Sequence, residues 1–195
     1  MKNYPAHVKR SLNAVIKNMA KHPGNFCHRP GKDFTRNRML PFEKVLSFLV
    51  KMGAHSLRDE MLDCLDFDNT PATVSALVQQ RRKVLPTALE YLFHEFTRIN
   101  ERTSHYKGHR LLAVDGSDLQ FTAAPSDPLS YFPGANGQKH YSMMHLNALY
   151  DLKSNLYMDA VVQKRREANE NAALVQMVDR SDIAAPTDQK ADKDS

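Results

Sequence analysis

Several residue types that mark particular classes of protein are scarce in this chain of 195 residues. Two cysteines, Cys27 and Cys64, are too few for a disulfide framework, and with nine methionines they fit a reducing interior. A membrane helix needs about 20 apolar residues in a row, and the longest apolar run of this sequence is much shorter. The charged start is not followed by the apolar segment of a secretory signal. The sequence therefore predicts a cytoplasmic protein without a membrane span.

Acidic residues are scarce in the first part of the chain. Residues 1–110 carry 19 lysines and arginines against 10 acidic residues, whereas residues 111–183 carry 6 against 9. A basic part followed by an acidic part is typical of a protein whose first module binds phosphates. Proteins that bind RNA show the same bias, so the charge alone indicates nucleic acid without choosing between RNA and DNA.

Helical periodicity dominates the first hundred residues. Apolar residues recur at helical spacing over residues 5–21, 41–53 and 57–65, which predicts three helices. Ser56 stands where a side chain can cap the third of them. Between the first two helices, residues 22–38 are rich in proline, glycine and basic residues, and we expect a loop there.

Two further helices are expected before residue 100. Thr70 followed by Pro71 is typical of an N-cap with a first-turn proline, which predicts a helix that runs to Val84 and is ended by Pro86. Thr87–Glu90 has the pattern of a capping box and is expected to open the next helix.

The pattern changes after a polar linker at residues 100–109. Residues 111–114 form a short continuous apolar run of the kind found in buried strands, and residues 141–150 and 156–162 are further strand candidates. Helical spacing returns from Asn169. Helices followed by strands and one more helix predict an α+β fold.

Asp115 is the residue that points most directly to chemistry. It ends the apolar run and is followed by Gly116 and Ser117, so we expect a carboxylate held at the end of a strand where the chain turns away. Mg²⁺ binds in proteins through one or two such carboxylates together with phosphate oxygens of the substrate. The alternative is a structural aspartate that forms an Asx turn with the backbone of Gly116 or Ser117.

Five segments around Asp115, in one order, carry a resemblance to a known family. The match covers roughly residues 65–183, and together the segments resemble the DDE transposases of bacterial insertion sequences, in particular the insertion-sequence-four family. The matching segments are Arg110–Ser117, Tyr141–Leu152, Tyr157–Asp159, Gln163 and Asn169–Leu174.

The resemblance implies an RNase H-like catalytic domain in which two aspartates and a glutamate hold two Mg²⁺ ions, or Mn²⁺ in their place, for DNA strand cleavage and transfer. Asp115 matches the first of these catalytic, metal-binding carboxylates. The segments that would carry the other two are not present. We therefore expect an incomplete α+β protein: a helical DNA-binding region at 1–105, a partial RNase H-like domain at 106–183 and a disordered tail at 184–195.

Three other aspartates are weaker substitutes for the missing ligands. Asp118 lies three residues along and could reach the same site, but a polar turn residue is the favoured interpretation. Asp151 and Asp159 flank the turn between the second and third strands and are expected to be surface residues. The enzyme class is thus transposase by resemblance, with no activity expected from this chain alone.

Two basic clusters are candidates for DNA contact. The first lies near the end of the helix expected after Thr70, where a preceding helix and a turn at 66–69 would give a helix-turn-helix-like layout. The second follows the third strand. The alternatives are a solvated helix face and an exposed loop. The clusters consist of Gln79, Gln80, Arg81, Arg82 and Lys83, and of Lys164, Arg165 and Arg166.

The expected partner is the double-stranded DNA of transposon ends, which would associate the protein with the nucleoid. The function implied is that of a truncated or frameshifted transposase, or of one half that another polypeptide completes. The alternative is a non-catalytic DNA-binding remnant that occupies the ends, self-associates or joins a full-length transposase.

Overall fold

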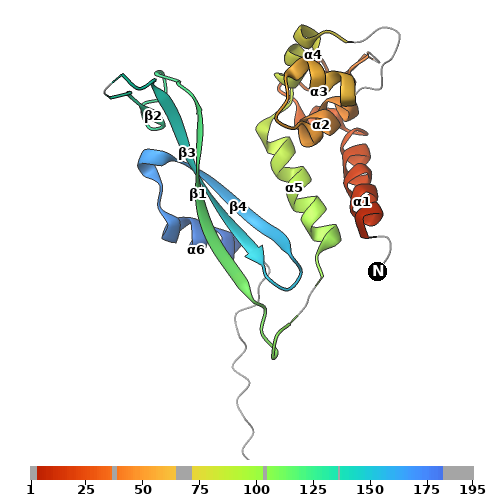
Figure 1. Ribbon diagram of the computed structural model, residues 1–195. Helices are drawn as coiled ribbons and strands as arrows, with labels where there is room; N and C mark the ends of the chain where they lie inside the picture. The colour runs from red at the N-terminus through yellow and green to blue at the C-terminus, as the bar shows by residue number, and fades with distance from the viewer. Residues whose placement is uncertain (1–3, 37–38, 65–71, 103–104, 136, 182–195) are drawn as a thin grey trace, which may run out of the picture. The chain divides into compact units, whose positions relative to one another are not determined.

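The computed structural model describes residues 4–36, 39–64, 72–102, 105–135 and 137–181. The chain divides into two compact units, residues 1–100 and 101–195, at the start of the polar stretch. The first unit is helical and the second holds an antiparallel sheet and a helix (Figure 1), so the predicted α+β class is confirmed. Within the described ranges, no helix combines the length and apolar character required to span a membrane. The tail predicted at 184–195 lies outside the described residues.

The described residues of the first unit form five α-helices and a short 3₁₀ helix. Its core consists of apolar side chains from all of the α-helices, as the periodicity predicts. A buried hydrogen bond between Ser11 and the Asn100 side chain, 3.0 Å long, joins the first and last helices. The elements are α1 (Tyr4–Met19), η1 (Pro23–Phe26), α2 (Phe42–Lys51), α3 (Leu57–Cys64), α4 (Val74–Arg81) and α5 (Pro86–Asn100).

Two helix starts differ from the prediction. α4 begins at Val74 because the Thr73 hydroxyl accepts a hydrogen bond from the Ala76 amide, which is an N-cap contact. The predicted cap at Thr70 lies outside the described residues. α5 begins at Pro86 rather than at a box opened by Thr87, because a proline suits the first helical position, where its missing N–H is not needed. The cap of α3 by Ser56 is confirmed, since its hydroxyl accepts from the Asp59 amide.

The second unit is organised around one long central strand. β3 (Tyr141–Asp151) pairs antiparallel with β1 (Leu112–Thr122) along its whole length. On its other side it pairs antiparallel with β4 (Leu156–Lys164) and, near its start, with the two-residue strand β2 (Tyr131–Phe132). Among the described residues β1 is paired on one side only, so it forms an edge of the sheet.

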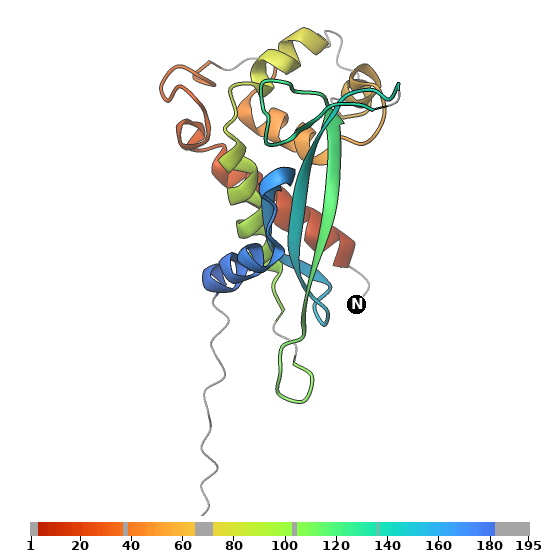
Figure 2. The same ribbon diagram turned by 90° about the vertical axis from the view of Figure 1, so that its left-hand side faces the viewer.

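One face of this sheet is covered by α6 (Glu170–Arg180), which follows β4 after the short 3₁₀ helix η2 (Arg165–Glu167). The helix lies on one side of β3 and β4 in both views (Figures 1 and 2), and Ala173 and Met177 pack there against Leu149 and Val161. Asn169 caps α6 by accepting a hydrogen bond from the Ala172 amide, 3.0 Å away. The helix predicted from Asn169 is thereby confirmed.

β1 is longer than the sequence predicts. It continues through Gly116 and Ser117 to Thr122, because each of its residues has a partner on β3. The prediction that the chain turns away after Asp115 is therefore wrong, and so is the prediction of a buried strand, since most side chains of β1 are exposed. Asp115 lies within the strand rather than at its end.

Candidate functional site

Asp115 lies on the face of the sheet opposite to α6. Successive side chains of a strand alternate between faces, and Val114 pairs with Leu149 on the face that the helix covers. The Asp115 side chain therefore projects from the other face, where it is exposed. Its Oδ1 accepts a hydrogen bond from the Gly116 amide, 2.9 Å away, as the structural alternative anticipates, although within a strand and not in a turn.

The face around Asp115 is open, and we call it the open face. In the row that crosses the three strands at Asp115, its partners are the small residues Ala148 and Ala160. Larger side chains flank this row, and Tyr157 and Val162 on β4 are each 56% exposed. Asp115 is thus a carboxylate at the edge of an exposed, largely apolar surface, which leaves its oxygens accessible to an approaching group.

The Asp118 side chain does not lie beside that of Asp115, because it projects from the other face of the sheet. There its Oδ1 lies 2.6 Å from Nδ1 of the buried His145, which pairs with it across the strands. Arg165 Nε lies 2.9 Å from the same oxygen. The hydrogen bond with His145, and then that with Arg165, holds the pKa of the Asp118 carboxyl below its usual value. Asp118 therefore does not lie beside Asp115, and the favoured interpretation of a polar turn residue is wrong as well, because Asp118 lies within β1 and pairs with His145.

Asp151 and Asp159 are buried, so the prediction of two surface residues is wrong. Asp151 accepts hydrogen bonds from the amides of Lys153 and Ser154, and Arg110 Nε lies 2.7 Å from its other oxygen. Burial raises the pKa of this carboxyl, but the two amides and the Arg110 guanidinium outweigh it and hold the pKa below its usual value. Asp151 organises the turn between β3 and β4 and does not face Asp115.

A metal site can be tested against these positions. In the described part of the chain no three His, Cys, Asp or Glu side chains are grouped so that they could hold an ion. His145 contacts Asp118 and Glu170 through opposite ring nitrogens, so these three side chains cannot converge on one ion. In the described part of the sheet, Asp115 has no acidic neighbour on its own face. The described residues therefore do not form a complete Mg²⁺ site.

The first basic cluster lies at the end of α4 and just after it. Gln79, Arg81 and Arg82 are exposed, whereas Gln80 and Lys83 are half-buried. The buried Leu77 anchors the opposite side of the helix in the core of the unit. The two arginines are thus presented to solvent on a fixed helix end, as phosphate contacts require. The turn at 66–69 on which a helix-turn-helix-like layout depends lies outside the described residues.

All three side chains of the second basic cluster contact other residues of the same unit. Lys164 Nζ lies 2.8 Å from Asp127, and Arg165 contacts Asp118. The Arg166 guanidinium donates to the Tyr131 carbonyl oxygen and lies 4.6 Å from the centre of the Phe132 ring. The contacts of Lys164 and Arg166 join the end of β4 and η2 to the loop that carries β2, and that of Arg165 joins η2 to β1.

Comparison with known proteins identifies no relative: the chain matches no family model, no curated protein and no solved structure.

Proposed function

We propose that this chain is an amino-terminal part of a DDE transposase that binds the DNA of transposon ends. In this proposal residues 1–105 contact the duplex, and Asp115 is the first Mg²⁺ ligand of a catalytic site that needs further carboxylates from elsewhere. The observation that carries it is the ordered set of matching segments around Asp115. The antiparallel pairing of β1, β3 and β4, followed by a helix on one face, is compatible with the first part of an RNase H-like domain.

DNA binding through the end of α4 is tested by replacing Arg81 and Arg82 together with alanine. We expect affinity for a 30-base-pair duplex to fall at least 10-fold, and the slope of log affinity against log salt to become shallower by about 2, because each lost phosphate contact contributes about 0.9. Fluorescence anisotropy with duplexes from the DNA that flanks the gene, and with scrambled versions, measures both quantities.

A matched control is available on α1, where Lys9 and Arg10 are also adjacent and exposed. Their double replacement by alanine removes the same charge from the same unit, and we expect it to change affinity and slope much less. Equal losses in the two double variants would show that only net charge matters. Binding that is absent or independent of salt would contradict the proposed function.

The chain alone is expected to perform no strand cleavage or transfer, because Asp115 lacks partner carboxylates among the described residues. Incubation with labelled end DNA and Mg²⁺ or Mn²⁺ should leave the strands intact on a denaturing gel. Metal-dependent cleavage that disappears in Asp115→Ala would show that the catalytic site is complete in this chain, and would refute its dependence on another polypeptide.

The second candidate function is a non-catalytic DNA-binding protein that regulates a full-length transposase. The isolated position of Asp115 favours it. Specific end binding without cleavage, combined with inhibition of a complete transposase in a mixed reaction, would distinguish this regulator from one half of a divided enzyme, which should restore cleavage when its other half is added.

A further inference from the structure

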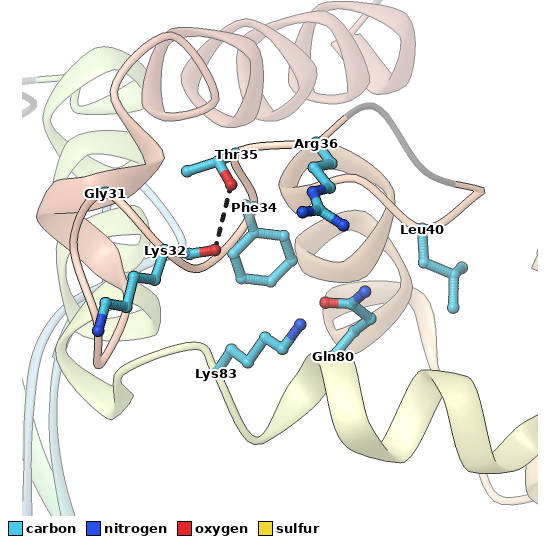
Figure 3. Close-up of a pocket in the computed structure, with 8 residues that line it drawn as sticks. All are labelled: Gly31, Lys32, Phe34, Thr35, Arg36, Leu40, Gln80 and Lys83. Carbon is cyan, nitrogen blue, oxygen red and sulfur yellow. Dashed lines mark hydrogen bonds between the residues drawn. The ribbon is translucent and has the colours of Figure 1, made fainter.

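A cavity of about 390 Å³ lies in the first unit between the loop after η1 and the end of α4 (Figure 3). Its two walls are joined by backbone hydrogen bonds. The His28 amide donates to the Lys83 carbonyl oxygen and the Leu85 amide donates to the Phe26 carbonyl oxygen, each over 2.9 Å. The walls come from segments about fifty residues apart, and this pairing holds them in a fixed relation. We call this cavity the loop pocket; its lining consists of Gly31, Lys32, Phe34, Thr35, Arg36, Leu40, Gln80 and Lys83.

The loop that forms one wall is held in shape by its own contacts. The buried Asp33 accepts hydrogen bonds from the Arg29 amide and the Arg29 guanidinium, both 3.1 Å long. The Thr35 hydroxyl donates to the Lys32 carbonyl oxygen. Gly31 and Phe34 adopt positive φ angles of 75° and 57°, which a non-glycine residue such as Phe34 rarely adopts without surrounding support. The loop pocket is therefore formed before any ligand arrives.

The lining of the loop pocket is positively charged. Arg36 and Lys83 lie around the Phe34 ring in Figure 3, and Lys83 Nζ is 5.8 Å from the centre of that ring. The Lys32 side chain points away from this group in the same view. Among the described residues, no acidic side chain lines the cavity. Two cations in a concave site favour an anionic group, because the carboxylate of the nearby Asp33 is buried and bonded to Arg29. Arginine and lysine both bind phosphate in this way.

Gln80 favours a ligand that also carries a hydrogen-bond donor. Its Oε1 is buried and has no hydrogen-bond partner among the described residues. A buried acceptor without a donor is unfavourable, so a ligand that supplies an N–H or O–H group there gains affinity. Inorganic phosphate carries its O–H donors on the anion itself, so it cannot place a donor at Gln80 independently of the two cations. A base amine or a sugar hydroxyl satisfies it, and Phe34 contributes an aromatic surface beside it.

We propose that the loop pocket binds one nucleotide unit, with Arg36 and Lys83 on the phosphate and Gln80 accepting from the base or sugar. The cavity volume lies within the range of about 300–1,000 Å³ that is usual for small-ligand sites. The nucleotide is either free or part of a DNA strand, and only the second source rests on the proposed function. Phe34 and Arg36 are thereby candidate binding residues in addition to the clusters that the sequence singles out.

The test uses the full chain and four probes: dAMP, inorganic phosphate, a ten-nucleotide adenine single strand and the 30-base-pair duplex. We expect dAMP to bind at least 10-fold more tightly than phosphate. Replacing Arg36 and Lys83 together with methionine should weaken dAMP binding at least 10-fold, whereas the Lys9→Met and Arg10→Met pair should leave it unchanged. Gln80→Leu should bring dAMP affinity close to that of phosphate. Titration calorimetry gives the affinities, and circular dichroism checks that each variant is folded.

The outcomes separate this proposal from the proposed function. A free-nucleotide site binds dAMP more tightly than the single strand, and a strand site does the reverse; both support the loop pocket. Nucleotide binding without any duplex binding leaves the loop pocket standing and refutes DNA-end binding. Duplex binding that depends on Arg81 and Arg82, with neither dAMP nor the single strand bound, refutes the loop pocket alone. Equal nucleotide affinity in wild type and in the folded Arg36 and Lys83 variant also refutes it.

Discussion

Replacing Arg110 with methionine should destabilise the second unit by about 3 kcal/mol. The Arg110 side chain is 16% exposed and lies 2.7 Å from the wholly buried Asp151, while its other end contacts Glu101 at 2.8 Å. Removing one partner of a buried ion pair leaves a buried charge without compensation, which costs about 3–5 kcal/mol. The two amides that also donate to Asp151 keep the loss near the lower end of that range.

Amide hydrogen exchange of β3 measures this loss in the second unit alone, and 3 kcal/mol corresponds to a fall in protection of at least 100-fold. The control is Arg165→Met, which removes a half-exposed contact with Asp118 and should cost less than about 1 kcal/mol. Unchanged protection of β3 in the Arg110 variant would show that this buried pair contributes nothing to stability.

The same pair gives a pH dependence with a defined sign. The pKa of Asp151 is lower in the folded unit than in the unfolded chain, so its contribution is complete above the unfolded value of about 3.9. This contribution is lost as the pH falls through the folded pKa. The stability difference between wild type and the Arg110→Met variant should therefore be largest near pH 7 and shrink below about pH 4. A difference that grows on acidification would contradict this account.

Gly116→Ala should cost the second unit about 2 kcal/mol. A Cβ atom at this position would lie 2.6 Å from Nε2 of His145 and 3.3 Å from Oε1 of Glu170. The imidazole cannot easily yield, because it is buried and its other nitrogen is bonded to Asp118 at 2.6 Å. Adding a methyl group to such a packed position costs about 1–3 kcal/mol. Glycine is thus required here by close approach of a neighbouring ring.

A double-mutant cycle distinguishes this cause from a general effect on the strand. In a His145→Ala background the added methyl group has space, so the cost of Gly116→Ala should fall below about 1 kcal/mol. Hydrogen exchange of β3 again measures both values. Equal costs in the two backgrounds would show that contact with the imidazole does not limit this position.

The sequence predicts the helical parts of this fold well, because apolar periodicity is a local property. Leu12, Val15, Ile16 and Met19 recur at helical spacing, and α1 packs that side against the core. Helix starts are harder to place, since several residues near each start can cap. The hydrogen bond from the Ala76 amide identifies Thr73 as the cap of α4. α5 begins at Pro86, one residue before the predicted start at Thr87.

The full length of β1 is not predicted from the sequence, because its side chains do not alternate between buried and exposed. Leu119 and Phe121 are exposed on an edge strand, so the pairing with β3 is the feature that extends it to Thr122. The burial of Asp151 also cannot be predicted from the residues around it in the sequence, because it depends on Arg110, 41 residues away. The loop pocket cannot be predicted from the sequence for the same reason. Arg36 and Lys83 are distant in the sequence and are brought together by the hydrogen bonds between their segments.

The side of β1 that has no strand partner among the described residues affects how experiments on Asp115 are interpreted. An exposed edge strand is a template on which a second chain can add a strand, and charged side chains are a common safeguard against such stacking. β1 carries two carboxylates, Asp115 on one face and Asp118 on the other, so two edges that approach each other meet negative charge on both faces. Neutralising Asp115 removes half of this protection along with the proposed metal ligand. Asp115→Lys keeps a charge but cannot bind Mg²⁺, so it separates loss of the proposed metal binding from loss of solubility.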